Sequence, residues 1–178
     1  PLYLMRSNGM LFFVSSDCDI YRYGNNQLIL IDKLDTKIES VYVADDNSAT
    51  IIAPASSPPS HGHANRYILF ADDKATSFDS FSPDKIDLYY ENISFVSRLS
   101  ASTFVIVYGE RESFFDTPHQ HVALLRHGRL YVSATDIGEL IYAGSAAGAR
   151  LLIVGNNQLL ASHGDALETL AGIRDITG

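Results

Sequence analysis

Cysteine, positive charge and long apolar runs are all scarce in this sequence. A single cysteine, Cys18, excludes an intrachain disulfide framework and a cluster of thiolate metal ligands. The longest apolar runs, such as Leu151–Val154, are far shorter than the roughly 20 residues that a membrane-spanning helix needs. Asp and Glu outnumber Lys and Arg by 21 to 13, and a net charge of −8 repels phosphate backbones. We therefore expect neither a membrane nor a nucleic acid as the principal partner.

The N-terminus lacks the features of a secretion signal. Residues 1–9 contain no basic region followed by an apolar stretch and a small-residue cleavage site. We expect a cytoplasmic protein, with the nucleus as the alternative compartment. The chain also begins without Met, directly in an expected strand, which indicates a fragment, a processed chain or an expression product.

Short β-branched and aromatic runs alternate with turns of Gly, Asn, Asp and Ser along the whole sequence. This pattern predicts an all-β protein, and the globular balance of 46% hydrophobic and 19% charged residues supports a packed core. Four segments look like superimposable hairpins, each with an apolar run, a polar turn and a second run. They are Leu2–Ser16, Arg66–Asp79, Val122–Ala134 and Leu151–His163.

A second unit recurs more clearly: an apolar strand, a small polar turn and a strongly apolar strand. It occupies Glu39–Ala53, Ile93–Val107 and Leu140–Val154, so it returns about every 50 residues. Several short strands at this period are typical of propeller blades. We predict a single all-β domain over residues 1–178, built of three to four blade-like repeats in a partial propeller. The alternative is a β-sandwich or barrel of cupin type.

Turn and loop residues separate these units. Glycines 9, 128 and 155 are expected to supply the positive φ of tight hairpin turns, and the pentapeptide GNNQL occurs at both 24–28 and 155–159. Residues 54–65 are rich in Pro and Ser and are expected to form an exposed loop. Helical spacing is found only in Gly164–Ile176, where we expect at most one short helix.

One part of the sequence, 121–141, has a distinctive order: a His, an Ala-Leu pair, Gly-x-hydrophobic-Tyr, and a Gly two residues before a Leu. The residues are His121, Ala123, Leu124, Gly128, Leu130, Tyr131, Gly138 and Leu140. This order resembles the repeat of the regulator of chromosome condensation propellers. The Trp-Gly that follows the Tyr in that family is absent here, and Ile141 stands in place of its final Gly.

The resemblance implies a propeller that works by binding proteins. In that family such a role is adaptor work or guanine-nucleotide exchange on a small GTPase. No position here matches a motif that could be assigned to exchange. An incomplete circle of blades would leave sheet faces uncovered, so we expect a protein partner or a second copy of the chain.

Four histidines form two His-x-His pairs, His61 with His63 and His119 with His121. On a strand, such a pair presents two imidazoles to one face, as zinc or copper sites require. Pro118–His121 is also similar to the metal motif of cupins, but the acidic residue of that motif is absent from Val122–Arg126. Exposure in a Pro/Ser loop explains His61 and His63, and a structural role in orienting a strand explains His121, so we predict no bound metal and no cofactor.

Paired carboxylates occur at Asp45-Asp46 and Asp72-Asp73, each at a predicted turn, where Asp side chains bond the local backbone. Nothing around them indicates the burial that acid–base catalysis requires, so we assign no catalytic residue. A non-enzymatic protein-interaction module is the favoured function. The alternatives are a metal-dependent cupin-type enzyme using the His-x-His pairs, and a small binding module for a toxin or a carbohydrate.

Overall fold

All regular structure that the computed structural model describes is β. The described residues are 2–7, 10–17, 19–33, 37–54, 66–72, 74–79, 93–110, 119–146 and 149–172. Sixteen strands lie within them, and they contain no helix. Accordingly, no helix in this part of the chain is long and apolar enough to cross a membrane.

The strands form four sheets of four, which we call blades 1 to 4. Blade 1 contains β1 (Leu2–Ser7), β2 (Met10–Ser15), β3 (Asp19–Gly24) and β4 (Gln27–Lys33). Blade 2 contains β5 (Ile38–Val43), β6 (Ala49–Pro54), β7 (Arg66–Ala71) and β8 (Lys74–Asp79). Blade 3 contains β9 (Ile93–Arg98), β10 (Thr103–Glu110), β11 (His119–Arg126) and β12 (Arg129–Gly138). Blade 4 contains β13 (Leu140–Ala146), β14 (Ala149–Gly155), β15 (Gln158–His163) and β16 (Ala166–Gly172).

Each blade is an antiparallel meander in which strands pair in chain order. Successive four-stranded meanders of this kind are the building unit of propellers. The chain is therefore all-β and of propeller type, as the strand pattern predicted. A cupin-type sandwich or barrel, the alternative fold, would instead combine the strands into two facing sheets or one closed sheet.

The two repeats seen in the sequence differ in meaning. The unit at 39–53, 93–107 and 140–154 corresponds to the first two strands of blades 2, 3 and 4. The four superimposed hairpins, in contrast, are not equivalent: they are β1–β2, β7–β8, β11–β12 and β14–β15. Any two antiparallel strands of alternating polarity can be superimposed, so hairpin likeness alone did not reveal the position within a blade.

No helix forms over the described residues 164–172, within the expected limit of one short helix. Within 164–176 the structure describes a turn followed by β16, which pairs with β15. Gly164 lies at φ +60° in that turn, which favours a hairpin over a helix start. Leu167 and Leu170 belong to the same strand but have different surroundings. Leu167 packs on the core, whereas Leu170 lies at a bulge in the pairing with Leu159 and Leu160 and is exposed. In the predicted loop 54–65, Pro54 ends β6 and the other residues lie outside the described part.

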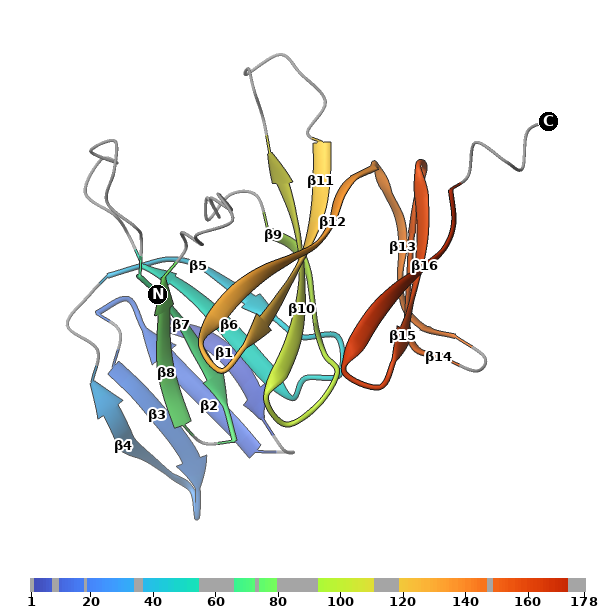
Figure 1. The fold of residues 1–178 in the computed structure, drawn as a ribbon. Helices are drawn as coiled ribbons and strands as arrows, with labels where there is room; N and C mark the ends of the chain where they lie inside the picture. The colour runs from blue at the N-terminus through green and yellow to red at the C-terminus, as the bar shows by residue number, and fades with distance from the viewer. Residues whose placement is uncertain are drawn as a thin grey trace.

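The apolar core is divided among the junctions between consecutive blades. One cluster joins blades 1 and 2, a second joins blades 2 and 3, and a third joins blades 3 and 4. Figure 1 shows blade 1 in blue and blade 4 in orange to red at opposite ends of the molecule. Each middle blade therefore buries both faces, which explains strands such as Phe104–Val107 that are apolar at consecutive positions.

Three arginines cross these junctions. Arg98 of blade 3 pairs with Asp72 of blade 2. Arg126 of blade 3 donates to the carbonyl of Asp165 in blade 4, and Arg150 of blade 4 donates to the carbonyl of Leu99 in blade 3. The two junctions on either side of blade 3 are thus stabilised by charge-assisted hydrogen bonds as well as by apolar packing.

Candidate functional site

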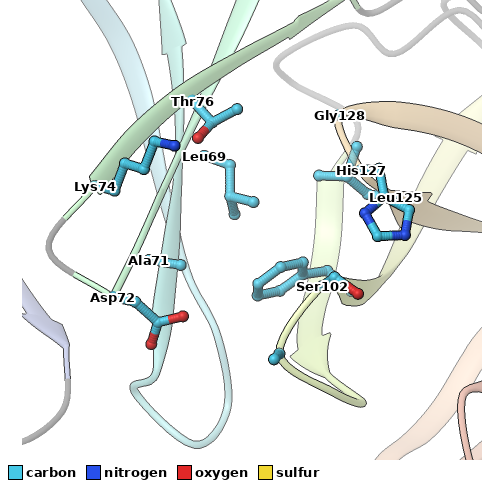
Figure 2. A pocket seen from close by; sticks show the side chains of 11 residues that line it. Leu69, Ala71, Asp72, Lys74, Thr76, Ser102, Leu125, His127 and Gly128 are labelled. Carbon is cyan, nitrogen blue, oxygen red and sulfur yellow. The ribbon is translucent and has the colours of Figure 1, made fainter.

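A pocket of about 350 Å³ lies at the junction of blades 2 and 3. Figure 2 shows its two walls, with the β7–β8 hairpin on one side and the turns of blade 3 on the other. It is lined by Leu69, Ala71, Asp72, Lys74, Thr76, Ala101, Ser102, Phe104, Leu125, His127 and Gly128. Three separate hairpin turns therefore contribute to one concave surface, an arrangement typical of binding sites on a rigid scaffold.

The floor of the pocket is apolar because it continues the core. Phe104 and Leu125 belong to the cluster between blades 2 and 3 and are almost fully buried, and Leu69 packs against the same cluster. Their side chains point from facing strands into one space, as alternation along β7, β10 and β11 requires. The floor of the pocket is thus apolar.

The rim is polar and is formed by turn residues. His127 and Gly128, at φ +49° and +75°, form the two-residue turn between β11 and β12. This confirms the positive φ predicted for Gly128. The backbone N–H of His127 donates to the carbonyl of Ser102 at 3.4 Å, which joins this turn to the β9–β10 turn. Lys74 and Thr76 are exposed on the opposite wall, on β8.

Arg98 contacts two residues that line the pocket, Asp72 and Phe104. Its Nη1 atom donates to Asp72 Oδ1 at 2.9 Å, and Nη2 donates to Oδ2 of the same carboxylate. Its Nε atom bonds the carbonyl of Ser100 at 3.0 Å, and its guanidinium lies 5.4 Å from the centre of the Phe104 ring. The hydrogen bond that Arg98 donates to Asp72 raises the pKa of Arg98, so this charge is permanent and already paired.

The other paired carboxylates behave as turn residues, as expected. Asp45 accepts a hydrogen bond from the N–H of Asp46, and Asp46 accepts one from the N–H of Ser48, both at 2.9 Å. Asp72 lies in the β7–β8 turn at φ +51°, and its neighbour Asp73 lies outside the described residues.

His119 and His121 both contact Asp136, a residue that the sequence did not indicate. His119 Nδ1 lies 3.1 Å from Asp136 Oδ1, and the backbone N–H of Asp136 donates to His121 Nδ1 at 3.1 Å. The acid was sought in the strand that carries the histidines, but it comes from β12 across the hairpin. A bulge opposite Gln120 and Val122, with Asp136 at φ +52°, places it there. The hydrogen bond with His119 lowers the pKa of the Asp136 carboxyl.

These groups do not assemble into a recognisable metal centre. Within the described residues, no three His, Cys, Asp or Glu side chains are grouped so that they could hold a metal ion. His121 uses its Nδ1 atom as an acceptor, and its ring lies 5.4 Å from that of Tyr108. His61 and His63, the other predicted pair, lie outside the described residues.

The outer face of blade 1 is a second candidate surface. Each blade has a forward face, toward the next blade in the chain, and a rear face. The rear face of blade 1 carries Leu4, Tyr23, Leu28 and Leu30, which are 51%, 43%, 52% and 52% exposed. The register places Leu30 opposite Tyr21 and Leu28 opposite Tyr23, so these side chains share one face of the sheet. This face is an apolar surface without cover among the described residues.

No protein-family model and no curated protein matches the sequence. Among solved structures, the chain is similar to a chain in a structure of S. cerevisiae Dbp5 bound to Nup159, Gle1, IP6 and ADP. There the TM-score is 0.44 and the identity 14%, over 94% of this chain and 50% of that chain. It is also similar to the GH74 enzyme of Niastella koreensis, with a TM-score of 0.44 and 14% identity over 92% of this chain and 29% of that one. This chain thus spans half or less of either structure, and the fold assignment rests on the strand order.

Proposed function

We propose that the chain is a protein-binding module of propeller type, and that the protein it binds is a second copy of itself. The observation that carries this proposal is the exposed apolar rear face of blade 1. Monomeric soluble proteins rarely expose contiguous apolar patches of more than a few hundred Å² without an interaction to serve.

The three junctions inside the molecule show which kind of surface packs on a rear face. At each of them, the forward face of one blade packs on the rear face of the next. Phe12 and Val14 of blade 1, for example, meet Ile52 and Phe70 of blade 2. The rear face of blade 1 therefore matches a forward face.

Blade 4 supplies the one forward face that no described blade covers. Its residues are Tyr142, Leu152, Val154 and Leu159, which lie on the side of the sheet opposite to the buried Ile153 and Leu160. Tyr142 is 45% exposed. The blade 4 of one copy can thus pack on the blade 1 of another as consecutive blades pack within the chain.

Two copies joined in this way form two identical head-to-tail contacts and a ring of eight blades, which is within the range of known propellers. A face of four strands and six residues measures roughly 19 by 20 Å, from strand spacing and rise. Two contacts cover four such faces, or about 1,500 Å², which is the size of a stable protein–protein interface.

The resemblance to the regulator of chromosome condensation repeats supports a finer proposal. The assembled ring would serve as an adaptor, or would exchange guanine nucleotides on a small GTPase. This finer activity rests on the resemblance, whereas self-association rests on the two end faces.

Sedimentation of the purified chain at micromolar concentration tests the proposal. We expect a dimer, and we expect Leu28→Asp to convert it to a monomer, because a carboxylate would be desolvated in the contact. Val43→Asp is the matched control: Val43 is 40% exposed but lies on blade 2, away from the end faces, so this variant should stay dimeric. A wild-type chain that is monomeric throughout this range overturns the proposal.

A further inference from the structure

The pocket between blades 2 and 3 is separate from the end faces. We propose that it binds a small carboxylic acid with a flat apolar body. Its residues come from β7, β8 and the turns of blade 3, and none of them lies on the rear face of blade 1 or the forward face of blade 4. The two proposals therefore stand or fall independently.

The apolar body is specified by the floor. Leu69 and Leu125 approach the space from opposite blades, and Phe104 also lines it. An apolar group placed there removes its own surface and the exposed part of Leu69 from water. A flat ring suits a space bounded by two facing sheets.

The negative charge is specified by the rim. Asp72 is held by both terminal nitrogens of Arg98, so these two charges compensate each other. Lys74, on the facing wall, forms no ion pair with another described residue. Among the described residues, the pocket consequently has one uncompensated positive charge, in a chain whose net charge is −8.

The remaining rim groups can form hydrogen bonds. Ser102 and Thr76 offer hydroxyls, and His127 offers an imidazole. The ammonium of Lys74 and the two hydroxyls match the single charge of a carboxylate. A doubly charged phosphate would keep one charge uncompensated close to Asp72, and phosphate sites generally use arginines or several main-chain N–H groups.

The size of the pocket limits the ligand. A volume of about 350 Å³ is at the small end of the range for small-molecule sites, which run from about 300 to 1,000 Å³. It suits a single aromatic ring with a short acidic arm. Such a group occurs both in free aromatic acids and at the carboxyl terminus of a peptide that ends in Phe.

The test is a nuclear magnetic resonance titration with 3-phenylpropionate, following the backbone amides of Ser102, His127 and Gly128. We expect saturable shifts with a dissociation constant on the order of 1 mM, as a ligand of this size permits. Acetate lacks the ring and 3-phenylpropionamide lacks the charge, so both should bind at least fivefold more weakly. Equal binding of the amide, or no shift at about 10 mM of the acid, overturns the proposal.

Two variants locate the charge. Lys74→Met should weaken binding at least fivefold, whereas Lys33→Met, which removes an exposed lysine of blade 1, should leave it unchanged. Equal effects of the two variants would contradict a role for Lys74. The tripeptide Gly-Gly-Phe and its amide distinguish the sources: tighter binding of the free tripeptide than of 3-phenylpropionate identifies a peptide terminus, and weaker binding identifies a free acid.

Discussion

The junction of blades 2 and 3 and the rear face of blade 1 are made of the same kinds of residue, yet only one of them is covered. Ile51 and Ile106 lie in the junction and are fully buried, whereas Leu28 and Leu30 of blade 1 are about half exposed. Both surfaces follow the alternation of a strand with an apolar face. The difference shows that the alternation marks a face as apolar, and that a neighbouring blade decides whether it is buried.

The pentapeptide GNNQL makes the same comparison with identical residues. At 24–28 it forms a free hairpin turn, with Asn25 and Asn26 at φ +52° and +58° and nothing near Gly24. At 155–159 it is docked on the end of blade 3, and the N–H of Asn157 donates to the carbonyl of Ile137 at 3.1 Å. Surroundings again decide the structure.

The docked copy also corrects one prediction. Gly155 was expected to adopt a positive φ, but it is not among the described residues that do so. Glycine is required there for another reason: a Cβ atom would lie 2.0 Å from the carbonyl oxygen of Ile137. The close approach of two backbones, and not the turn, needs the missing side chain.

The largest expected effect is the difference in stability loss between a variant in the junction of blades 2 and 3 and a variant on the rear face of blade 1. Ile106→Ala should lower the free energy of unfolding by about 3 kcal/mol, because it leaves a cavity between two blades. Leu30→Ala removes a half-exposed side chain and should lower it by less than about 1 kcal/mol. Urea unfolding followed by circular dichroism, at a concentration where copies are separate, measures both. Equal losses would show that the blade 1 face is covered within one chain.

A smaller difference in stability is expected between glycine variants in the two GNNQL copies. Gly155→Ala should destabilise the chain by about 2 kcal/mol, because the Cβ atom forces the Ile137 backbone to move. Gly24→Ala meets no atom within 4 Å and should change the stability by less than about 0.5 kcal/mol. The comparison of melting temperatures checks this, and a Gly155→Ala variant as stable as the Gly24→Ala variant would refute the docked turn.

The smallest effect concerns the exposed rim of the junction between blades 3 and 4. Because its hydrogen bond with His119 lowers the pKa of Asp136, the ionised carboxylate is favoured by folding. Its contribution is present above the pKa of the unfolded carboxyl and is lost as the pH falls through the lower folded value. His119→Gln should raise the pKa of Asp136 toward its ordinary value in a carboxyl carbon titration. His163→Gln, which changes an exposed histidine elsewhere on blade 4, should not alter it.

The fold could be predicted from the sequence because strands and tight turns are determined by residues that are neighbours in the chain. The strand alternation predicted an all-β chain, and the His127-Gly128 pair predicted its turn. The pocket could not be predicted, since it combines Lys74 of one hairpin with Ser102 and His127 of two others. Asp136 was missed for a similar reason: a bulge in strand pairing, which no residue pattern announces, brings it to His119.

The central claim is that the forward face of blade 4 of one copy packs on the rear face of blade 1 of another. Mixing two variants tests it directly by sedimentation. Leu28→Asp spoils only the blade 1 face and Tyr142→Asp spoils only the blade 4 face, so each variant alone should be monomeric. Mixed in equal amounts, they retain one contact made of two intact faces, which is about half of the wild-type contact area, so we predict a heterodimer that forms at a higher protein concentration than the wild-type dimer. A mixture that associates no more than either variant alone at the same total concentration, while the wild-type chain is dimeric, would contradict the head-to-tail arrangement.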